Sequence, residues 1–116
     1  MSQFTSPPKV LDYNIQVWEI VRQIPVGKVS SYGRIAKMIA APNVEKAKSY
    51  NAFGARWVGG AMAKSPDDVP WWRVVNAQGK ISSRPNALHQ KELLEADGVI
   101  FDERERIDFK IYLWEY

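Results

Sequence analysis

Apolar residues recur at intervals of three and four in the first part of the chain, which is the spacing of one face of an α-helix. The pattern predicts a helix over residues 14–23, whose buried face would consist of Val17, Ile20, Val21 and Ile24. Asp12 or Asn14 can cap its start, and Pro25 with Gly27 ends it. The chain is therefore expected to begin, after its first residues, with an amphipathic helix.

Two further helices are predicted close behind the first. Ser31 is a favoured N-cap residue, and a short helical stretch over residues 32–39 follows it. After a turn at 40–43 and a polar stretch, residues 52–63 are rich in small side chains and carry one arginine. Two helices joined by a turn in this way are typical of a helix-turn-helix unit.

Glycine is frequent in the third of these segments. Gly54, Gly59 and Gly60 each lower helix propensity by up to about 1 kcal/mol relative to alanine. Glycine is used where a backbone must approach another body closely. The pattern leaves open whether that body is another helix of this chain or an external partner.

The remaining segments are short. Residues 69–76 form a buried stretch of undecided type, residues 88–96 are predicted to be a helix that Gly98 ends, and residues 99–101 and 107–114 are predicted to be extended. Residues 1–11 contain two adjacent prolines and are expected to form a flexible N-terminal arm. We expect one mainly helical domain over residues 12–116.

Composition excludes several classes of function. The 116 residues are 46% hydrophobic and 25% charged, as in a single globular domain. There is no cysteine and only one histidine, His89, which excludes disulfides, thiolate zinc sites and a cysteine nucleophile. We therefore expect no metal, no cofactor and no catalytic residue of the Ser/His or Cys/His type.

The sequence also carries an expectation of cellular location. No apolar run approaches the ~18 residues of a membrane span, and the first residues do not resemble a signal peptide. We expect no membrane partner and an intracellular protein, located in the cytoplasm or nucleoid of a bacterium or in the nucleus of a eukaryote.

Charge is distributed unevenly along the chain. Residues 22–91 hold twelve Lys or Arg against three acids, a net charge of +9. Residues 92–116 hold eight acids against three Lys or Arg, a net charge of −5. Such an asymmetry is typical of a protein that binds a polyanion on one face, although a mixed solvated surface would give the same counts.

Three segments resemble the DNA-binding domain of O6-alkylguanine-DNA alkyltransferases: residues 24–33, 55–62 and 69–76. The last contains a Pro-x-x-Arg-Val-Val motif, in which the alkyltransferases have Cys-His after the proline. This chain has Trp71-Trp72 there and resembles the alkyltransferase-like proteins, which lack the reactive cysteine. The resemblance covers roughly residues 14–114 and implies a mainly α, single winged-helix-like or helix-turn-helix domain with short extended segments.

The resemblance also implies a function. Alkyltransferase-like proteins bind O6-alkylguanine in duplex DNA through the minor groove, flip the nucleotide without dealkylating it and mark it for nucleotide excision repair. The expected partners are therefore double-stranded DNA that contains O6-alkylguanine and nucleotide excision repair proteins. We expect the protein to act as a monomer.

The resemblance implies roles for individual residues at the positions where this sequence matches the family. The resemblance implies that Arg56 enters the base stack and that Tyr32, after the capping Ser31, presses on a backbone phosphate. A slim helix face in the minor groove would consist of Ala55, Val58, Gly59 and Ala61, and Gly60 and Ser31 are also expected to contact DNA. The lesion pocket would contain Trp71, Arg84, Val69 and Met62, and main-chain groups of Val69 and Trp71 could bind the base. Trp57 and Trp72 are expected to fill the interior.

The chemistry of these residues agrees with binding rather than repair. Direct transfer of an alkyl group needs an activated thiolate, which an indole cannot replace. Trp72 stands where the alkyltransferases have the activating histidine. Asp97 stands where they have the carboxylate of the relay, and without a histidine to orient we expect it to be structural.

Two departures from the family pattern affect these expectations. The chain is longer between Ala41 and Arg56 than the compact turn of that family, which predicts an inserted loop over residues 43–54. Lys46 and Lys48 in it could contact DNA. Ser65 replaces an asparagine that often braces the loop before the pocket.

Two alternative functions are left open. A helix-turn-helix transcription regulator would read sequence in the major groove and would need Asn, Gln or Arg along its recognition helix. An enzyme with a displaced nucleophile would use Ser65 or Ser82, each of which needs a base within hydrogen-bond reach.

Overall fold

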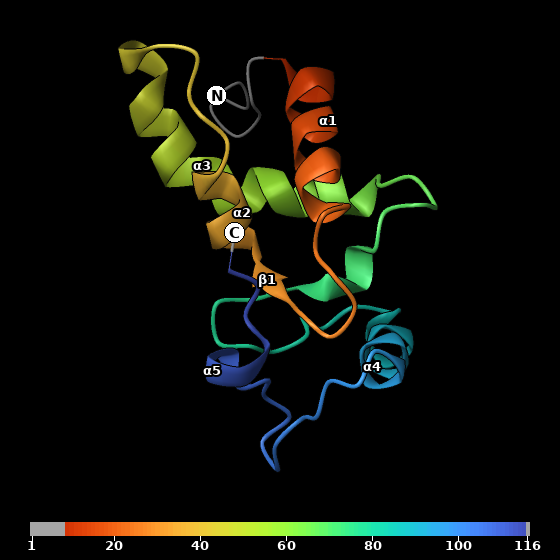
Figure 1. The fold of residues 1–116 in the computed structure, drawn as a ribbon. Coiled ribbons are helices and arrows are strands. Elements are labelled where there is room, and N and C mark those ends of the chain that lie inside the picture. The colour runs from red at the N-terminus through yellow and green to blue at the C-terminus, as the bar shows by residue number, and fades with distance from the viewer. Residues whose placement is uncertain (1–8, 116) are drawn as a thin grey trace.

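The computed structural model describes residues 9–115, a mainly helical domain with a small sheet (Figure 1). Its elements are α1 (Val10–Val21), β1 (Ser30–Ser31), α2 (Tyr32–Lys37), α3 (Val44–Ala63), a 3₁₀ helix (Trp71–Arg73), β2 (Val74–Val75), α4 (Ala87–Ala96) and α5 (Phe109–Tyr112). The predicted fold class is confirmed. Helix α1 begins at Val10, earlier than predicted, and residues 1–8 of the expected arm lie outside the described residues.

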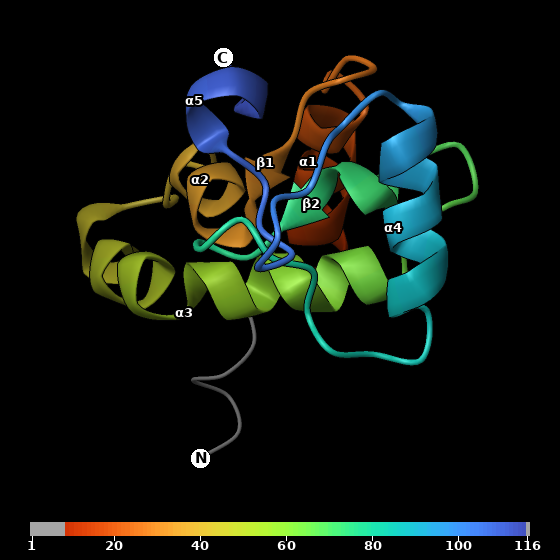
Figure 2. The same ribbon diagram turned by 90° about the horizontal axis from the view of Figure 1, so that it is seen from below.

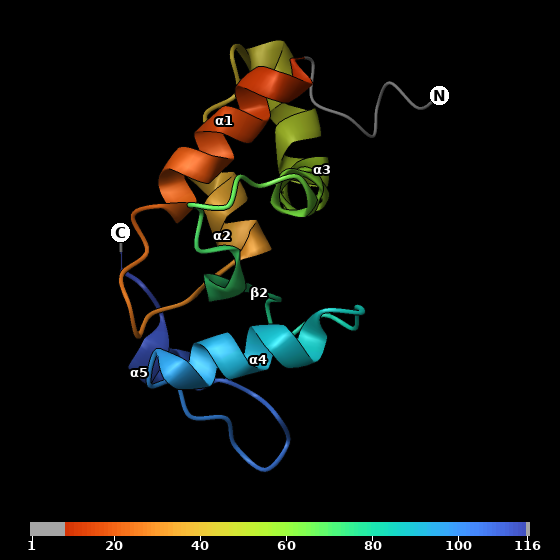
Figure 3. The ribbon, with the colours of Figure 1, turned by 90° about the vertical axis from the view of Figure 1, so that its right-hand side faces the viewer.

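Helices α1, α2 and α3 pack together, and α4 and α5 lie on the other side of the short strands (Figure 3). The strands are parallel and pair Ser30 with Val74 and Ser31 with Val75. Because side chains alternate along a strand, Val74 packs with the cluster of α1–α3, whereas Val75 packs with Leu94 and the C-terminal residues. The strand β2 thereby joins the two halves of the core.

The first core cluster fixes α3 against α1. The indole Nε1 of Trp18 donates a 2.8 Å hydrogen bond to the carbonyl oxygen of Ala61. Trp57 is only 4% exposed, which confirms its predicted place in the core. Its ring contacts Tyr13 and Tyr50 edge-on, with centroids 5.5 and 5.2 Å apart. Aromatic packing of this kind holds α3 in one orientation.

The predicted loop over residues 43–54 is wrong, because these residues form the first half of α3. Asn43 caps the helix by accepting a 3.0 Å hydrogen bond from the backbone N–H of Lys46. The Glu-Lys-Ala-Lys run that follows favours helix. Gly54 allows α2 and α3 to approach, since a Cβ there would lie 2.8 Å from the Cβ of Ala36.

The prediction of an extended segment over residues 107–114 is also partly wrong. Phe109–Tyr112 form the single turn of α5, whose start Asp108 caps by accepting a hydrogen bond from a backbone N–H. Leu113 then pairs with Val29 beside the small sheet. The capping aspartate in an otherwise alternating pattern explains the extra turn.

Candidate nucleic-acid interface

Ser31 sets the start of α2 as predicted. Its Oγ accepts a 3.3 Å hydrogen bond from the backbone N–H of Arg34, and its side chain is buried. A direct contact between the Ser31 side chain and DNA is therefore not supported. Ser31 instead positions the next residue, Tyr32, which lies partly exposed at the first turn of the helix.

Helix α3 runs along one side of the molecule and presents a face to solvent (Figure 2). Ala55, Arg56 and Gly60 are exposed, and Gly59 is partly exposed. The further prediction that Val58 and Ala61 share this face is wrong, because both side chains are buried in the core. Over residues 55–63 the open face carries alanine and glycine around one arginine, and lacks the Asn and Gln side chains that a major-groove reader would need.

The three glycines of α3 have different surroundings. A Cβ at Gly54 would meet Ala36, so this glycine serves packing between helices of the chain. A Cβ at Gly59 or Gly60 would meet nothing within 4 Å among the described residues. Internal packing therefore explains Gly54 only. Gly59 and Gly60 lower the helix propensity of this segment, and because they have no side chains they leave the open face smooth.

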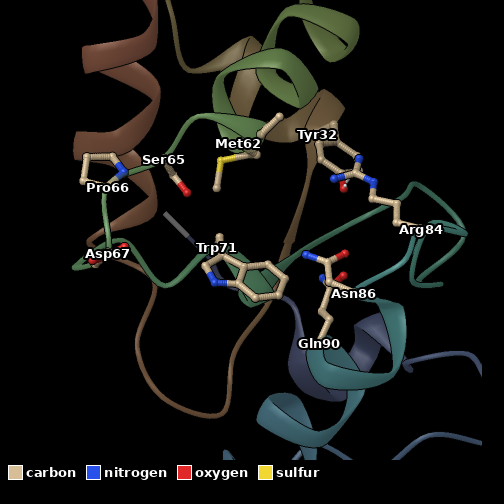
Figure 4. Close-up of a pocket in the computed structure, with 10 residues that line it drawn as sticks. Tyr32, Met62, Ser65, Pro66, Asp67, Trp71, Arg84, Asn86 and Gln90 are labelled. Atoms are coloured by element: carbon tan, nitrogen blue, oxygen red, sulfur yellow. Dashed lines mark hydrogen bonds between the residues drawn. The ribbon is translucent and has the colours of Figure 1, made fainter.

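A cavity of about 320 Å³ lies where α3 ends, within the size range of ligand pockets (Figure 4). Its lining consists of Tyr32, Met62, Ala63, Ser65, Pro66, Asp67, Trp71, Arg84, Asn86 and Gln90. It brings together three of the four residues expected in the lesion pocket. The exception is Val69, which is fully buried in the core and takes no part in the lining.

The two adjacent tryptophans have different roles. Trp71 lines the cavity, and its ring meets that of Trp72 edge-on at 6.0 Å. Trp72 packs against the second core cluster. Its Nε1 donates a 3.1 Å hydrogen bond to Asp97, which also accepts hydrogen bonds of 2.8 and 3.3 Å from Arg73. Asp97 is thus structural, as predicted, and Trp71 alone of the two presents its ring to the cavity.

The main-chain groups expected to bind a base are already engaged with each other. The backbone N–H of Trp71 donates a 2.7 Å hydrogen bond to the carbonyl oxygen of Val69. This donor is therefore not free for a ligand.

Arg84 and Tyr32 meet at the mouth of the cavity. The Nη2 of Arg84 donates a 3.1 Å hydrogen bond to the Tyr32 hydroxyl, and its guanidinium lies 5.7 Å from the ring centroid. The two residues come from different elements, the start of α2 and the loop before α4 (Figure 4). They close one side of the cavity.

Sequence reasoning missed five lining residues, Ala63, Pro66, Asp67, Asn86 and Gln90, of which the last two carry side-chain amides. Gln90 is 4% exposed, and its Nε2 donates to the carbonyl oxygens of Trp72 and Val74 at 3.1 and 3.0 Å. These two bonds fix the amide against the wall of the cavity. Its position four residues before the buried Leu94, on the same face of α4, was the available signal.

The loop that follows α3 is tied to α1. Arg22 donates hydrogen bonds of 2.9 and 3.2 Å to the carboxylate of Asp68, and this hydrogen bonding lowers the pKa of Asp68. The same loop carries Ser65, which lines the cavity. Within residues 9–115 the Ser65 hydroxyl makes no hydrogen bond to a basic side chain, so the displaced-nucleophile alternative gains no support.

Residues 9–115 contain no group of three or more metal-ligating side chains. None of the helices in this range has the length and apolar character needed to cross a membrane.

Residues 12–99 match the family model of the 6-O-methylguanine DNA methyltransferase DNA-binding domain. A DNA base-flipping protein of Vibrio parahaemolyticus is 40% identical over 87% of this chain and 94% of its own. Alkyltransferase-like protein 1 of Schizosaccharomyces pombe is 37% identical over 90% of this chain and 93% of its own.

A solved structure extends this similarity to the fold. The crystal structure of Schizosaccharomyces pombe Atl1 in complex with damaged DNA containing O6-carboxymethylguanine matches with a TM-score of 0.74 and 32% identity. The match covers 93% of this chain and 99% of that one. The chain therefore belongs to the family of the 6-O-methylguanine DNA methyltransferase DNA-binding domain and, within it, to the alkyltransferase-like proteins.

Proposed function

We propose that this protein binds O6-alkylguanine in duplex DNA, turns the nucleotide out of the helix and holds it in the cavity beside Trp71. The observation that carries the proposal is the continuity of two surfaces. The open face of α3, with Arg56, Gly59 and Gly60, leads along one helix to Met62 and Ala63 in the cavity lining. A protein that lays this face in the minor groove has the cavity beside the duplex.

The cavity suits an extruded base. The ring of Trp71 offers a flat wall, and base–aromatic stacking contributes about 1–3 kcal/mol, enough to offset much of the cost of flipping. Arg84 supplies a planar cation at the mouth, where it can donate hydrogen bonds to the purine. The relative from Vibrio parahaemolyticus is named for base flipping, and the structure from Schizosaccharomyces pombe holds DNA with an O6-alkylated guanine.

The alkyl group stays on the base. The chain has no cysteine, so no thiolate is present to accept it. Trp71 stands where the methyltransferases carry that cysteine, and an indole is not a nucleophile for an O6-alkyl ether. The activity is therefore recognition without repair.

Arg56 and Tyr32 perform the extrusion in this proposal. Arg56 is exposed on α3 and long enough to enter the stack, where its guanidinium donates hydrogen bonds to the orphaned cytosine. Tyr32 lines the cavity at the first position of α2, where its ring can press on the phosphate of the turning nucleotide.

A fluorescence experiment tests the flipping step. A duplex carries 2-aminopurine next to one O6-methylguanine, because the emission of 2-aminopurine rises when its neighbour leaves the stack. Addition of the protein should raise the emission, and Arg56→Ala should reduce the rise at saturating protein. An unmodified duplex is the control. Saturated binding to the lesion without any rise would contradict the flipping step.

We also propose that the bound monomer marks the lesion for nucleotide excision repair within the cell. The acidic C-terminal part includes α5, on the side of the molecule away from α3, and thus stays accessible to a repair protein while α3 contacts DNA (Figure 2). Incision of a plasmid with one O6-methylguanine by a purified excision-repair nuclease should increase when the protein is added. Unchanged incision would refute the coupling.

A further inference from the structure

The first half of α3 continues the helix that carries Arg56. We name residues 44–53 the α3 extension. Tyr50 packs edge-on against Trp57 at 5.2 Å, and Phe53 stacks on the same ring at 6.0 Å. These contacts tie the extension to the second half of the helix, although the axis of α3 bends between the two halves (Figure 1).

The two lysines of the α3 extension lie on different sides of the helix. Lys48 is seven residues before Ala55 and eleven before Gly59, so it shares their open face. Lys46 lies about 160° around the axis from Lys48 and shares a side with Phe53 and Trp57. Both lysines are exposed. Lys48 therefore continues the Ala55 and Gly59 side of the open face, whereas Lys46 lies beyond its Gly60 edge.

A second cavity continues the open face toward the extension. It measures about 420 Å³ and lies between α2 and α3, lined by Gly33, Ala36, Lys37, Ile39, Ala40, Ala41, Ala47, Tyr50, Asn51 and Ala55. Ala55, at one end, belongs to the open face of α3. Lys37 is the one charged residue of this lining, and Lys48 is three residues before Asn51.

The charges beside this cavity have no partners within the described residues. No ion pair there includes Lys37 or Lys48. The acid of the extension, Glu45, lies three residues before Lys48 in the first turn of α3, where it favours the helix N-terminus, and none of the ion pairs within residues 9–115 joins the two. Two lysines without ion-pair partners, next to a cavity lined by small side chains, can bind the phosphates of a DNA backbone that lies there.

We propose that Lys37, Lys48 and Asn51 bind the sugar–phosphate backbone of the same duplex, beyond the flipped nucleotide. This inference rests on the proposed function. Lys48 and Arg56 are eight residues apart, a helix rise of at most about 12 Å, so both can reach the backbone of one duplex. The extension thus adds contacts to phosphates, which raise affinity for DNA, and does not contribute to the preference for the lesion.

Salt titrations with matched variants test this inference. Affinity for a duplex with one O6-methylguanine is measured over a range of salt for the unchanged protein, Lys48→Ala, Lys46→Ala and the double variant Lys37→Ala/Lys48→Ala. The slope of log K against log salt should shrink by about 0.9 for each phosphate that the protein no longer neutralises. We expect this decrease for Lys48→Ala, up to twice as much for the double variant, and an unchanged slope for Lys46→Ala.

The outcomes separate this inference from the proposed function. Every variant should keep the preference for the lesion, because phosphate contacts carry no base information. Equal slopes for Lys46→Ala and Lys48→Ala would overturn the inference, since they would indicate either a general charge effect or no contact. If the unchanged protein shows no lesion preference, the proposed function fails, whatever the slopes. Circular dichroism of each variant confirms that the exposed substitutions leave the helices intact.

Discussion

Arg84 holds the hydroxyl of Tyr32 with a 3.1 Å hydrogen bond while its guanidinium lies 5.7 Å from the centre of the same ring. This pair links the residue expected to push on DNA with the residue expected to contact the base. An incoming phosphate competes for the guanidinium, because a hydrogen bond between two charged groups is stronger than one to a phenol. We therefore expect the pair to rearrange when DNA binds.

Substitution Arg84→Ala should reduce the preference for O6-methylguanine over guanine. The expected decrease is about tenfold, the equivalent of one charge-assisted hydrogen bond of about 1.5 kcal/mol. Stability should change by less than about 0.5 kcal/mol, because Arg84 is exposed. Titrations with lesion and plain duplexes measure the ratio, with Arg84→Lys as the variant that keeps the charge but removes the planar fork. An equal fall of both affinities would reduce Arg84 to a phosphate contact.

Trp71 and Trp72 form a matched pair for testing the wall of the cavity. Trp71→Ala should lower lesion preference by about 5- to 150-fold, the range that corresponds to 1–3 kcal/mol of stacking. Trp72→Phe removes the hydrogen bond to Asp97 and should cost about 1 kcal/mol of stability while leaving the preference unchanged. Competition binding and urea unfolding of both variants provide the data. Preference retained by Trp71→Ala would show that this ring only fills space.

Substitutions at two glycines of α3, Gly60 and Gly54, should have opposite effects on stability. Gly60→Leu meets open space, so stability should hold or rise by up to about 1 kcal/mol, but the side chain fills the open face and should weaken binding to every duplex. Gly54→Ala puts a Cβ 2.8 Å from that of Ala36 and should cost about 1–3 kcal/mol of stability. Thermal unfolding and duplex titrations measure both effects. Unchanged DNA affinity of Gly60→Leu would remove α3 from the interface.

Asp97 should matter for stability and not for recognition. Asp97→Ala leaves Arg73 without its carboxylate at a site where both side chains are 11% exposed, and should cost about 3 kcal/mol. The exposed pair of Arg22 and Asp68 is the control, and Asp68→Ala should change stability little. Urea unfolding measures the difference between the two variants. A fall in lesion preference in the folded Asp97→Ala protein would contradict a purely structural role.

Local rules predicted the parts of the fold that depend on neighbouring residues. The cap at Ser31 and the buried Trp57 follow from residue type and spacing, and the structure confirms both. The same reasoning failed for residues 43–54, because the comparison with a shorter family turn outweighed the helix-forming run and its cap at Asn43. Propensity was the better guide there.

Long-range pairings were beyond the sequence. Tyr32 and Arg84 are 52 residues apart, and no periodicity connects them. The burial of Val69 depends on how the turn after α3 folds back, and the role of Gln90 depends on carbonyl groups of the 3₁₀ helix and β2. The matched motifs predicted which segments of the chain form the site. Which side chains of those segments line the cavity depends on the three-dimensional packing.

One binding measurement tests the central claim most directly. Two short duplexes, identical except for one O6-methylguanine, are titrated at fixed salt, and the modified strand is then recovered and its methyl group quantified. The account predicts tighter binding to the modified duplex with the methyl group fully retained. Equal affinity for the two duplexes, or removal of the methyl group from the recovered strand, would contradict it.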